Sequence, residues 1–103
     1  MTDKWQLQKC PKGEFTCDNS IKSAEDIPEL LKVLEKKFSV KYDDKGTVGP
    51  DGVYFSVTIG EEQATIGWDI WSGVFIMPKD IKGNYVIEAV YEYLSGQEKG
   101  EHK

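Results

Sequence analysis

Residues 53–70 read VYFSVTIGEEQATIGWDI, and this stretch decides the fold. Apolar and polar side chains alternate over 53–59 and again over 64–70, which is the period of a β-strand with one buried face. The connection between the two runs is only GEEQ, and connections of this length join antiparallel neighbours. The stretch therefore predicts a hairpin at the centre of an antiparallel sheet.

Three shorter strands are predicted around this hairpin. Residues 4–8 and 40–42 alternate in the same way, and 74–77 form an apolar run that ends at Pro78, since proline cannot donate to a ladder. Turn-forming residues dominate the segments between them. We expect a loop or a short irregular hairpin over 9–22, and an exposed, mobile loop over 43–52.

Two helices are predicted where the apolar period lengthens to about 3.6 residues. The first spans 26–38, with Asp26 as its N-cap and Glu29 as the reciprocal acid. The second begins at Asn84, its expected cap, and ends at Gly96. The two apolar stripes are Ile27, Leu30, Leu31, Leu34 and Phe38 in the first helix, and Val86, Ala89, Val90, Tyr93 and Leu94 in the second.

These elements define an α+β fold: a two-layer sandwich in which two helices pack on one face of a mostly antiparallel sheet of four to five strands. We expect a single domain over residues 1–96 and a disordered tail over 97–103. The predicted apolar face carries Val53, Phe55, Val57, Ile59, Ile66, Trp68 and Ile70. The opposite face carries Tyr54, Ser56, Thr58, Thr65, Asp69 and Trp71.

Composition excludes several functions. The 103 residues carry a net charge of −5, so nucleic acid and anionic membranes are poor partners. The only histidine is His102, next to the chain end, and no G-x-S-x-G elbow or phosphate-binding loop occurs. We therefore expect a protein that is not an enzyme and holds no cofactor or metal. No leader or membrane-spanning run is visible, so the cytoplasm is the expected location.

Cys10 and Cys17 flank a turn-forming segment, so a disulfide between them is geometrically possible. In the cytosol they would stay reduced. Two cysteines with one remote histidine do not supply the usual zinc ligands. We expect two thiols in a surface loop.

The most unusual stretch is residues 67–73, GWDIWSG. If the strand period continues, Asp69 and Trp71 face solvent together, where a carboxylate beside an indole can bind a lysine or arginine of a partner. Alternatively, Trp71 folds over the sheet edge as a lid and Asp69 caps a turn. The loop acids Asp43, Asp44, Asp51, Glu61 and Glu62 either steer a basic partner or form ordinary solubilising surface.

Residues 67–77, GWDIWSGVFIM, follow an alternating strand and precede a terminal helix, and in this layout the C-terminal half resembles small immunity proteins of bacterial toxin systems. The segment with Cys10 and Cys17 lies outside the resemblance. The resemblance implies a compact, acidic, non-enzymatic protein that neutralises a basic toxin by covering its surface. It transfers no functional residue to this chain.

The sequence thus favours a small interaction protein that binds a basic protein partner through Tyr54, Asp69, Trp71, Glu61 and Glu62. One alternative is a small-molecule or peptide-binding domain with a pocket between sheet and helices, lined by Trp5, Phe15, Trp68 and Tyr93. A homodimer formed through a sheet edge is a further alternative.

Overall fold

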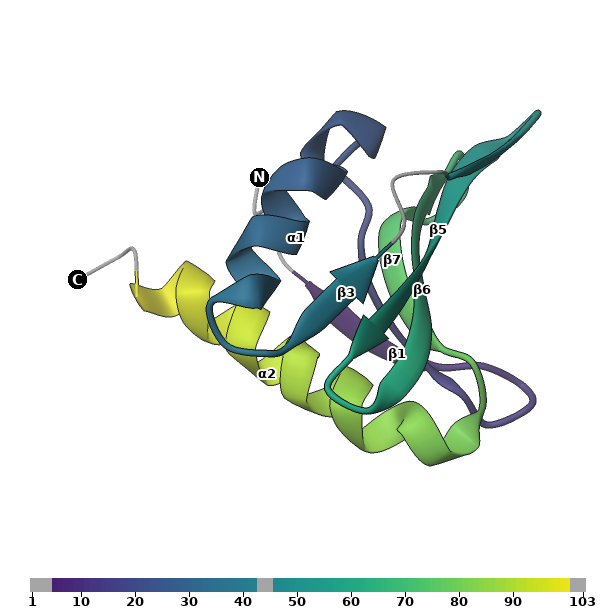
Figure 1. The fold of residues 1–103 in the computed structure, drawn as a ribbon. Coiled ribbons are helices and arrows are strands. Elements are labelled where there is room, and N and C mark those ends of the chain that lie inside the picture. The colour runs from purple at the N-terminus through teal and green to yellow at the C-terminus, as the bar shows by residue number, and fades with distance from the viewer. Residues whose placement is uncertain (1–4, 43–45, 101–103) are drawn as a thin grey trace.

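The computed structural model describes residues 5–42 and 46–100. It has an α+β fold in which one antiparallel sheet carries two helices (Figure 1). The strands are β1 (Gln6–Lys9), β2 (Phe15–Asn19), β3 (Val40–Tyr42), β4 (Thr47–Gly49), β5 (Gly52–Ile59), β6 (Glu62–Asp69) and β7 (Gly73–Pro78). The helices are α1 (Ile27–Glu35) and α2 (Asn84–Gly100), preceded by the short 3-10 turns η1 (Ala24–Asp26) and η2 (Ile81–Gly83).

The predicted central hairpin is confirmed, since β5 and β6 pair antiparallel along their whole length, from Gly52 with Asp69 to Ile59 with Glu62. The order across the sheet is β1-β2-β7-β6-β5-β3, and β4 pairs with β5 on the same side as β3. The described residues therefore contain seven strands, where four to five were expected. The two additional strands are β2, inside the loop or short irregular hairpin predicted over 9–22, and β4, inside the loop predicted over 43–52.

The sequence does not predict β4, because residues 46–49, GTVG, are typical of a turn. Pairing with β5 holds this segment extended. Thr47 pairs with Tyr54, Val48 with Val53 and Gly49 with Gly52, next to the start of β5. The part of the predicted mobile loop over 43–45 lies outside the described residues.

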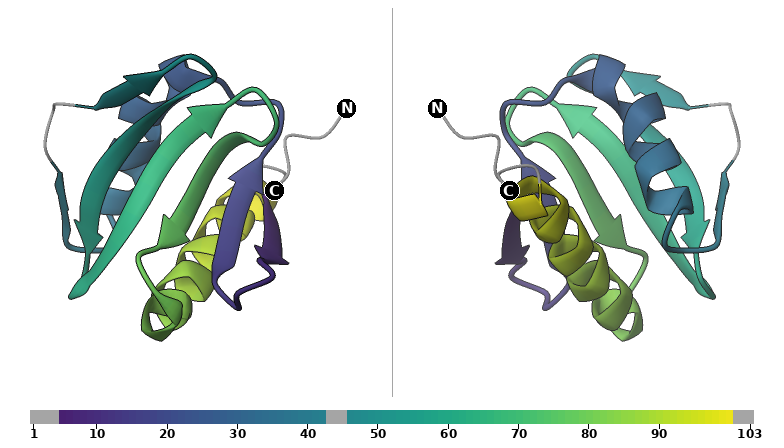
Figure 2. Two further views of the ribbon diagram at one scale, coloured as in Figure 1. Left: turned by 90° about the vertical axis from the view of Figure 1, so that its right-hand side faces the viewer. Right: turned by 90° about the vertical axis from the view of Figure 1, so that its left-hand side faces the viewer.

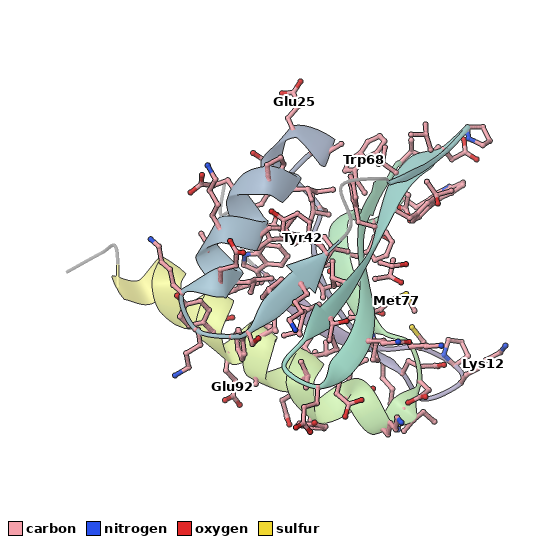
Figure 3. All side chains as sticks on the ribbon, in the orientation of Figure 1. Lys12, Glu25, Tyr42, Trp68, Met77 and Glu92 are labelled. Carbon is pink, nitrogen blue, oxygen red and sulfur yellow. The ribbon has the colours of Figure 1, made fainter. Side chains whose placement is uncertain are left out.

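Both helices lie on one side of the sheet, as the two views in Figure 2 show. The core lies between them and the sheet; it unites Leu34 and Ile87 from the helices with Ile59, Ile66 and Ile76 from the strands, all fully buried. Trp68 points to this helix side and Met77 to the opposite side, which we call the open face (Figure 3). The predicted alternation holds through the strands but fails for Ile70, which lies beyond the end of β6 and is exposed.

The predicted helix caps hold only in part. Asp26 stands at the N-cap position of α1, as predicted, but its side chain makes no cap hydrogen bond there; its carboxylate accepts the backbone N–H of Ser23, one turn earlier, across η1. Before α2, Asp80 accepts the N–H of Lys82 and starts η2. The helix α2 continues past Gly96 to Gly100, so residues 97–100 are helical rather than part of a tail, and 101–103 lie outside the described residues.

The α2 stripe also differs from the prediction. Ala89 is exposed, and Ile87 is fully buried in its place. Asn84 does not act as a cap for α2; its side chain donates to the carbonyl of Gly13 at 3.0 Å and accepts the N–H of Phe15 at 2.9 Å. This side chain therefore fastens the start of α2 to the β1–β2 turn.

Candidate functional site

The sheet has two ends that separate the predicted site residues. We call the tip end the one where β2 and β6 finish and β5 and β7 begin, and the base end the one where β6 begins after the Gly60 turn. Asp69 lies at the tip end, followed by Trp71, whereas Glu61 and Glu62 lie at the base end. The eight residues of β6 span about 23 Å. The five residues predicted to form a single site are therefore divided between two surfaces.

Trp71 lies in the turn between β6 and β7 and is 72% exposed. It therefore does not cover the core as a lid. Its neighbour Ile70 is also exposed, because the strand ends at Asp69 and the period of two does not reach the turn. Two consecutive large apolar side chains thus face solvent at the tip end.

Asp69 has a local structural role. Its Oδ1 accepts the backbone N–H of Trp71 at 3.0 Å and of Ser72 at 2.6 Å. These bonds close the turn and hold the backbone that carries the indole. The turn-capping alternative is therefore correct for Asp69, while the lid alternative is wrong for Trp71.

Tyr54 lies on the open face near the tip end and is half-buried. Its ring leans over Gly67, where an added Cβ would lie 3.0 Å from Tyr54 Cδ1. On the other side of this glycine lies Phe75, whose ring centroid is 6.0 Å from that of Tyr54. The pair replaces the missing side chain of Gly67, so part of the tyrosine ring is used for packing.

Asp18 is a candidate that sequence reasoning missed. It pairs with Phe75 across β2 and β7 and therefore lies on the same face. The amide of Gln8 donates to its Oδ2 at 2.9 Å. Burial raises the pKa of Asp18, the bond from Gln8 lowers it, and the negative charge of Asp69 raises it further, with a net upward shift. The sequence held no signal for this site, because β2 was not predicted.

Two further exposed apolar side chains accompany Trp71 and Ile70 at the tip end. Val48, in the edge strand β4, is 77% exposed, and Ile21, just after β2, is 44% exposed. The turn that follows β4 and the turn that follows β2 lie next to the Trp71 turn: the N–H of Ile70 donates to the carbonyl of Asp51 at 3.1 Å, and the carbonyl of Asn19 closely approaches Gly73. We call these four exposed residues the tip patch.

The base end uses its polar groups internally. Glu62 accepts the hydroxyl proton of Tyr85 at 2.9 Å, and this bond is the main cause of a raised pKa of Tyr85, with smaller contributions from burial and from the charges of Glu62 and Glu61. Glu61 is exposed in the Gly60 turn. Neither glutamate lies near the tip patch.

The four residues proposed to line a pocket belong to the hydrophobic core. Trp5 is 6% exposed, and Phe15, Trp68 and Tyr93 pack against the core as partly buried side chains. The edge of Tyr93 meets Phe38 with ring centroids 5.8 Å apart. Their burial is explained by core packing alone.

Cys10 and Cys17 are not joined by a disulfide. Cys17 is fully buried on the helix side of β2, so the expectation of two surface-loop thiols is wrong for it. The Cys10 sulfur lies 3.1 Å from the Thr16 hydroxyl. Over residues 5–42 and 46–100, no group of three or more His, Cys, Asp or Glu side chains is placed to hold a metal ion. No helix in the same part of the chain is long and apolar enough to cross a membrane.

Comparisons of the chain with protein-family models, with curated proteins and with solved structures found no match.

Proposed function

We propose that this chain is a small, non-enzymatic interaction protein of the cytoplasm that binds a basic protein partner, in the manner of an immunity protein that covers a toxin. The observation that carries the proposal is the 72% exposure of Trp71 in a turn whose backbone is held by Asp69. An indole on a constrained turn loses little conformational freedom on binding and buries a large area, which makes tryptophan a frequent interface anchor. The net charge of −5 supports a basic partner through long-range attraction.

Asp69 enters this proposal as a positioning residue. Because its Oδ1 already accepts two N–H groups, replacing it would disturb the turn as well as the surface charge. Asp69→Lys is therefore expected to lower stability and cannot serve as a clean binding probe. Trp71→Ala is the cleaner change, since removing an exposed side chain should alter the free energy of unfolding by no more than about 0.5 kcal/mol.

The test uses the full chain as bait in an extract of its source cells, with Trp71→Ala and Tyr85→Ala compared with wild type. Tyr85 is an exposed aromatic residue at the base end and is the matched control. A basic protein captured by wild type and Tyr85→Ala, lost with Trp71→Ala and rebound after purification of both components supports the proposal. Unfolding of Trp71→Ala, or equal capture by all three baits, contradicts it.

A further inference from the structure

The exposed apolar side chains of this molecule are unevenly distributed. Seven large apolar residues are exposed within the part of the chain that the structure describes, and four of them form the tip patch of Ile21, Val48, Ile70 and Trp71. Single exposed apolar residues are ordinary on a protein surface. Four at one end of a sheet are less ordinary, and exposed apolar patches often mark an interaction site.

The tip patch is built on connected backbone. The turn after β4 and the turn after β6 share the hydrogen bond from Ile70 to Asp51, and the β6–β7 turn packs against the end of β2 at Gly73. Val48 belongs to the row of its pair Val53 and of Trp68, so it lies at the edge of the patch towards the helix side of the sheet. Backbone contacts thus join the turns around the patch.

Charges at the two ends indicate what kind of partner fits. The carboxylates of Asp18, Asp51 and Asp69 lie near the tip end, and Glu25 projects from η1 at the top of the molecule in Figure 3. The base end carries Lys9, Lys12, Lys79 and Lys82 together with the acids Glu61, Glu62 and Asp80, whereas Lys22 is the lysine that lies beside Ile21 at the tip end among the described residues. A second copy docked tip to tip would bring like charges together, because a two-fold interface places the same patch on both sides. A segment with lysine or arginine beside apolar residues meets no such repulsion.

The size of the patch sets a further requirement. A stable interface buries about 800 Å² on each partner, which four side chains cannot supply alone. The partner must also cover adjoining surface. The open face next to the tip end offers Tyr54 and the carboxylate of Asp18, which repels that of Asp69 and would gain from a nearby cation.

We propose that the tip end is the docking surface for a partner segment that combines apolar side chains with lysine or arginine, the apolar groups covering the tip patch and the cations facing Asp18, Asp51 and Asp69. The inference rests on the proposed function and defines the surface and chemistry of that interaction. Apolar contact then governs the dissociation rate, and charge governs association and its salt dependence.

The test measures binding of short acetylated peptides to the full chain by backbone amide NMR shifts. The probe alternates lysine with leucine; one control peptide alternates lysine with serine, and another glutamate with leucine. Ile70→Ser and Ile81→Ser are the matched variants, since these isoleucines are 59% and 55% exposed at opposite ends of the sheet. Ile70→Ser should weaken binding of the lysine–leucine peptide about fivefold, as expected for one partly buried isoleucine, whereas Ile81→Ser should change it less than twofold.

The shifts should also map to the tip end and be absent with the glutamate–leucine peptide. Equal effects of the two variants, equal binding of the two leucine peptides, or binding of the lysine–serine peptide as tight as that of the probe would overturn the proposal. A dimer seen by light scattering and dispersed by Ile70→Ser would replace the partner with a second copy. A further outcome is that a natural partner binds Ile70→Ser and Val48→Ser normally and fails to bind Trp71→Ala. That result would support the proposed function and contradict the claim that the tip patch is the docking surface.

Discussion

The two ends of the sheet use their side chains differently. At the base end, polar groups bond across long stretches of chain: Asn84 reaches the β1–β2 turn and Tyr85 reaches Glu62. At the tip end, Asp69 bonds only to the next turn, and large apolar side chains face solvent. The base end thus uses side-chain bonds to fasten distant segments, whereas the tip end leaves four large apolar side chains exposed, and this exposure is the basis of the proposed docking surface.

The largest expected loss of stability concerns the backbone of the tip end, which should be rigid although its side chains are exposed. Gly73 has a φ of +74°, and an added Cβ would lie 2.4 Å from the carbonyl oxygen of Asn19. Gly73→Ala should therefore lower the free energy of unfolding by about 3 kcal/mol or more, measured by urea denaturation. Gly60 has a φ of +64° but open space around it, so Gly60→Ala should cost only about 1 kcal/mol. Equal losses of stability in the two variants would mean that the tip turn can rearrange to accommodate the added methyl group.

The second prediction concerns the fastening of the base end. Asn84→Ala removes two bonds and leaves the N–H of Phe15 and the carbonyl of Gly13 without this partner, which should cost about 2 kcal/mol. Amide exchange should accelerate at Phe15 more than at Ile66 in the sheet centre. Asp80→Ala, which removes one local cap bond, should cost about 1 kcal/mol. A smaller loss for Asn84→Ala than for Asp80→Ala would show that the base end is not held in this way.

The third prediction concerns the ionisation of Asp18 near the tip end. The folded-state pKa of Asp18 lies above its ordinary value of 3.8, so the ionised form is the less favourable one in the folded state. Any stability that Asp18 contributes is therefore present below the unfolded pKa and lost as pH rises through the folded pKa. Asp18→Asn should slightly raise stability at neutral pH and have no effect well below pH 3.8, by urea denaturation at both. A loss of stability at neutral pH would contradict the raised pKa of Asp18, which burial causes first and the charge of Asp69 adds to.

The smallest effect is a change of titration at the base end. The hydrogen bond to Glu62 raises the pKa of Tyr85 above 10.0. Glu62→Gln removes the carboxylate charge and should bring this pKa back toward 10.0, followed by the ring-carbon NMR shift of Tyr85. Glu61→Gln is the matched control and should have less effect, since Glu61 acts only through its charge. Equal shifts for both variants would exclude a direct bond.

The central elements of the fold could be predicted because their signals are local. The alternation of β5 and β6 and the stripe from Ile27 to Leu34 follow from a period that each segment carries within itself. Ile70 was placed wrongly because the period was extended beyond the residue at which Asp69 closes the turn. The prediction of Asn84 as a helix cap is wrong because asparagine at a helix start usually bonds locally, whereas its partners here lie about 70 residues away in sequence.

The candidate site was predicted in part. Trp71 could be singled out because a tryptophan in a glycine-flanked turn is unusual, and its exposure agrees with that prediction. The sequence could not identify Val48, Ile21 and Asp18 as candidate site residues, because their position at the tip end depends on which strands pair. Glu61 and Glu62 were grouped with Asp69 only by their charge, and the length of β6 separates them.

Alternation, turn residues and charge by themselves determined that this chain forms an antiparallel sheet with amphipathic helices and an acidic surface, since each of these properties is carried by neighbouring residues. The tertiary structure alone decided which turns meet at one end of the sheet, and therefore which exposed side chains form a common surface. That information depends on register between distant strands, and register is set by burial of the whole core rather than by any single segment.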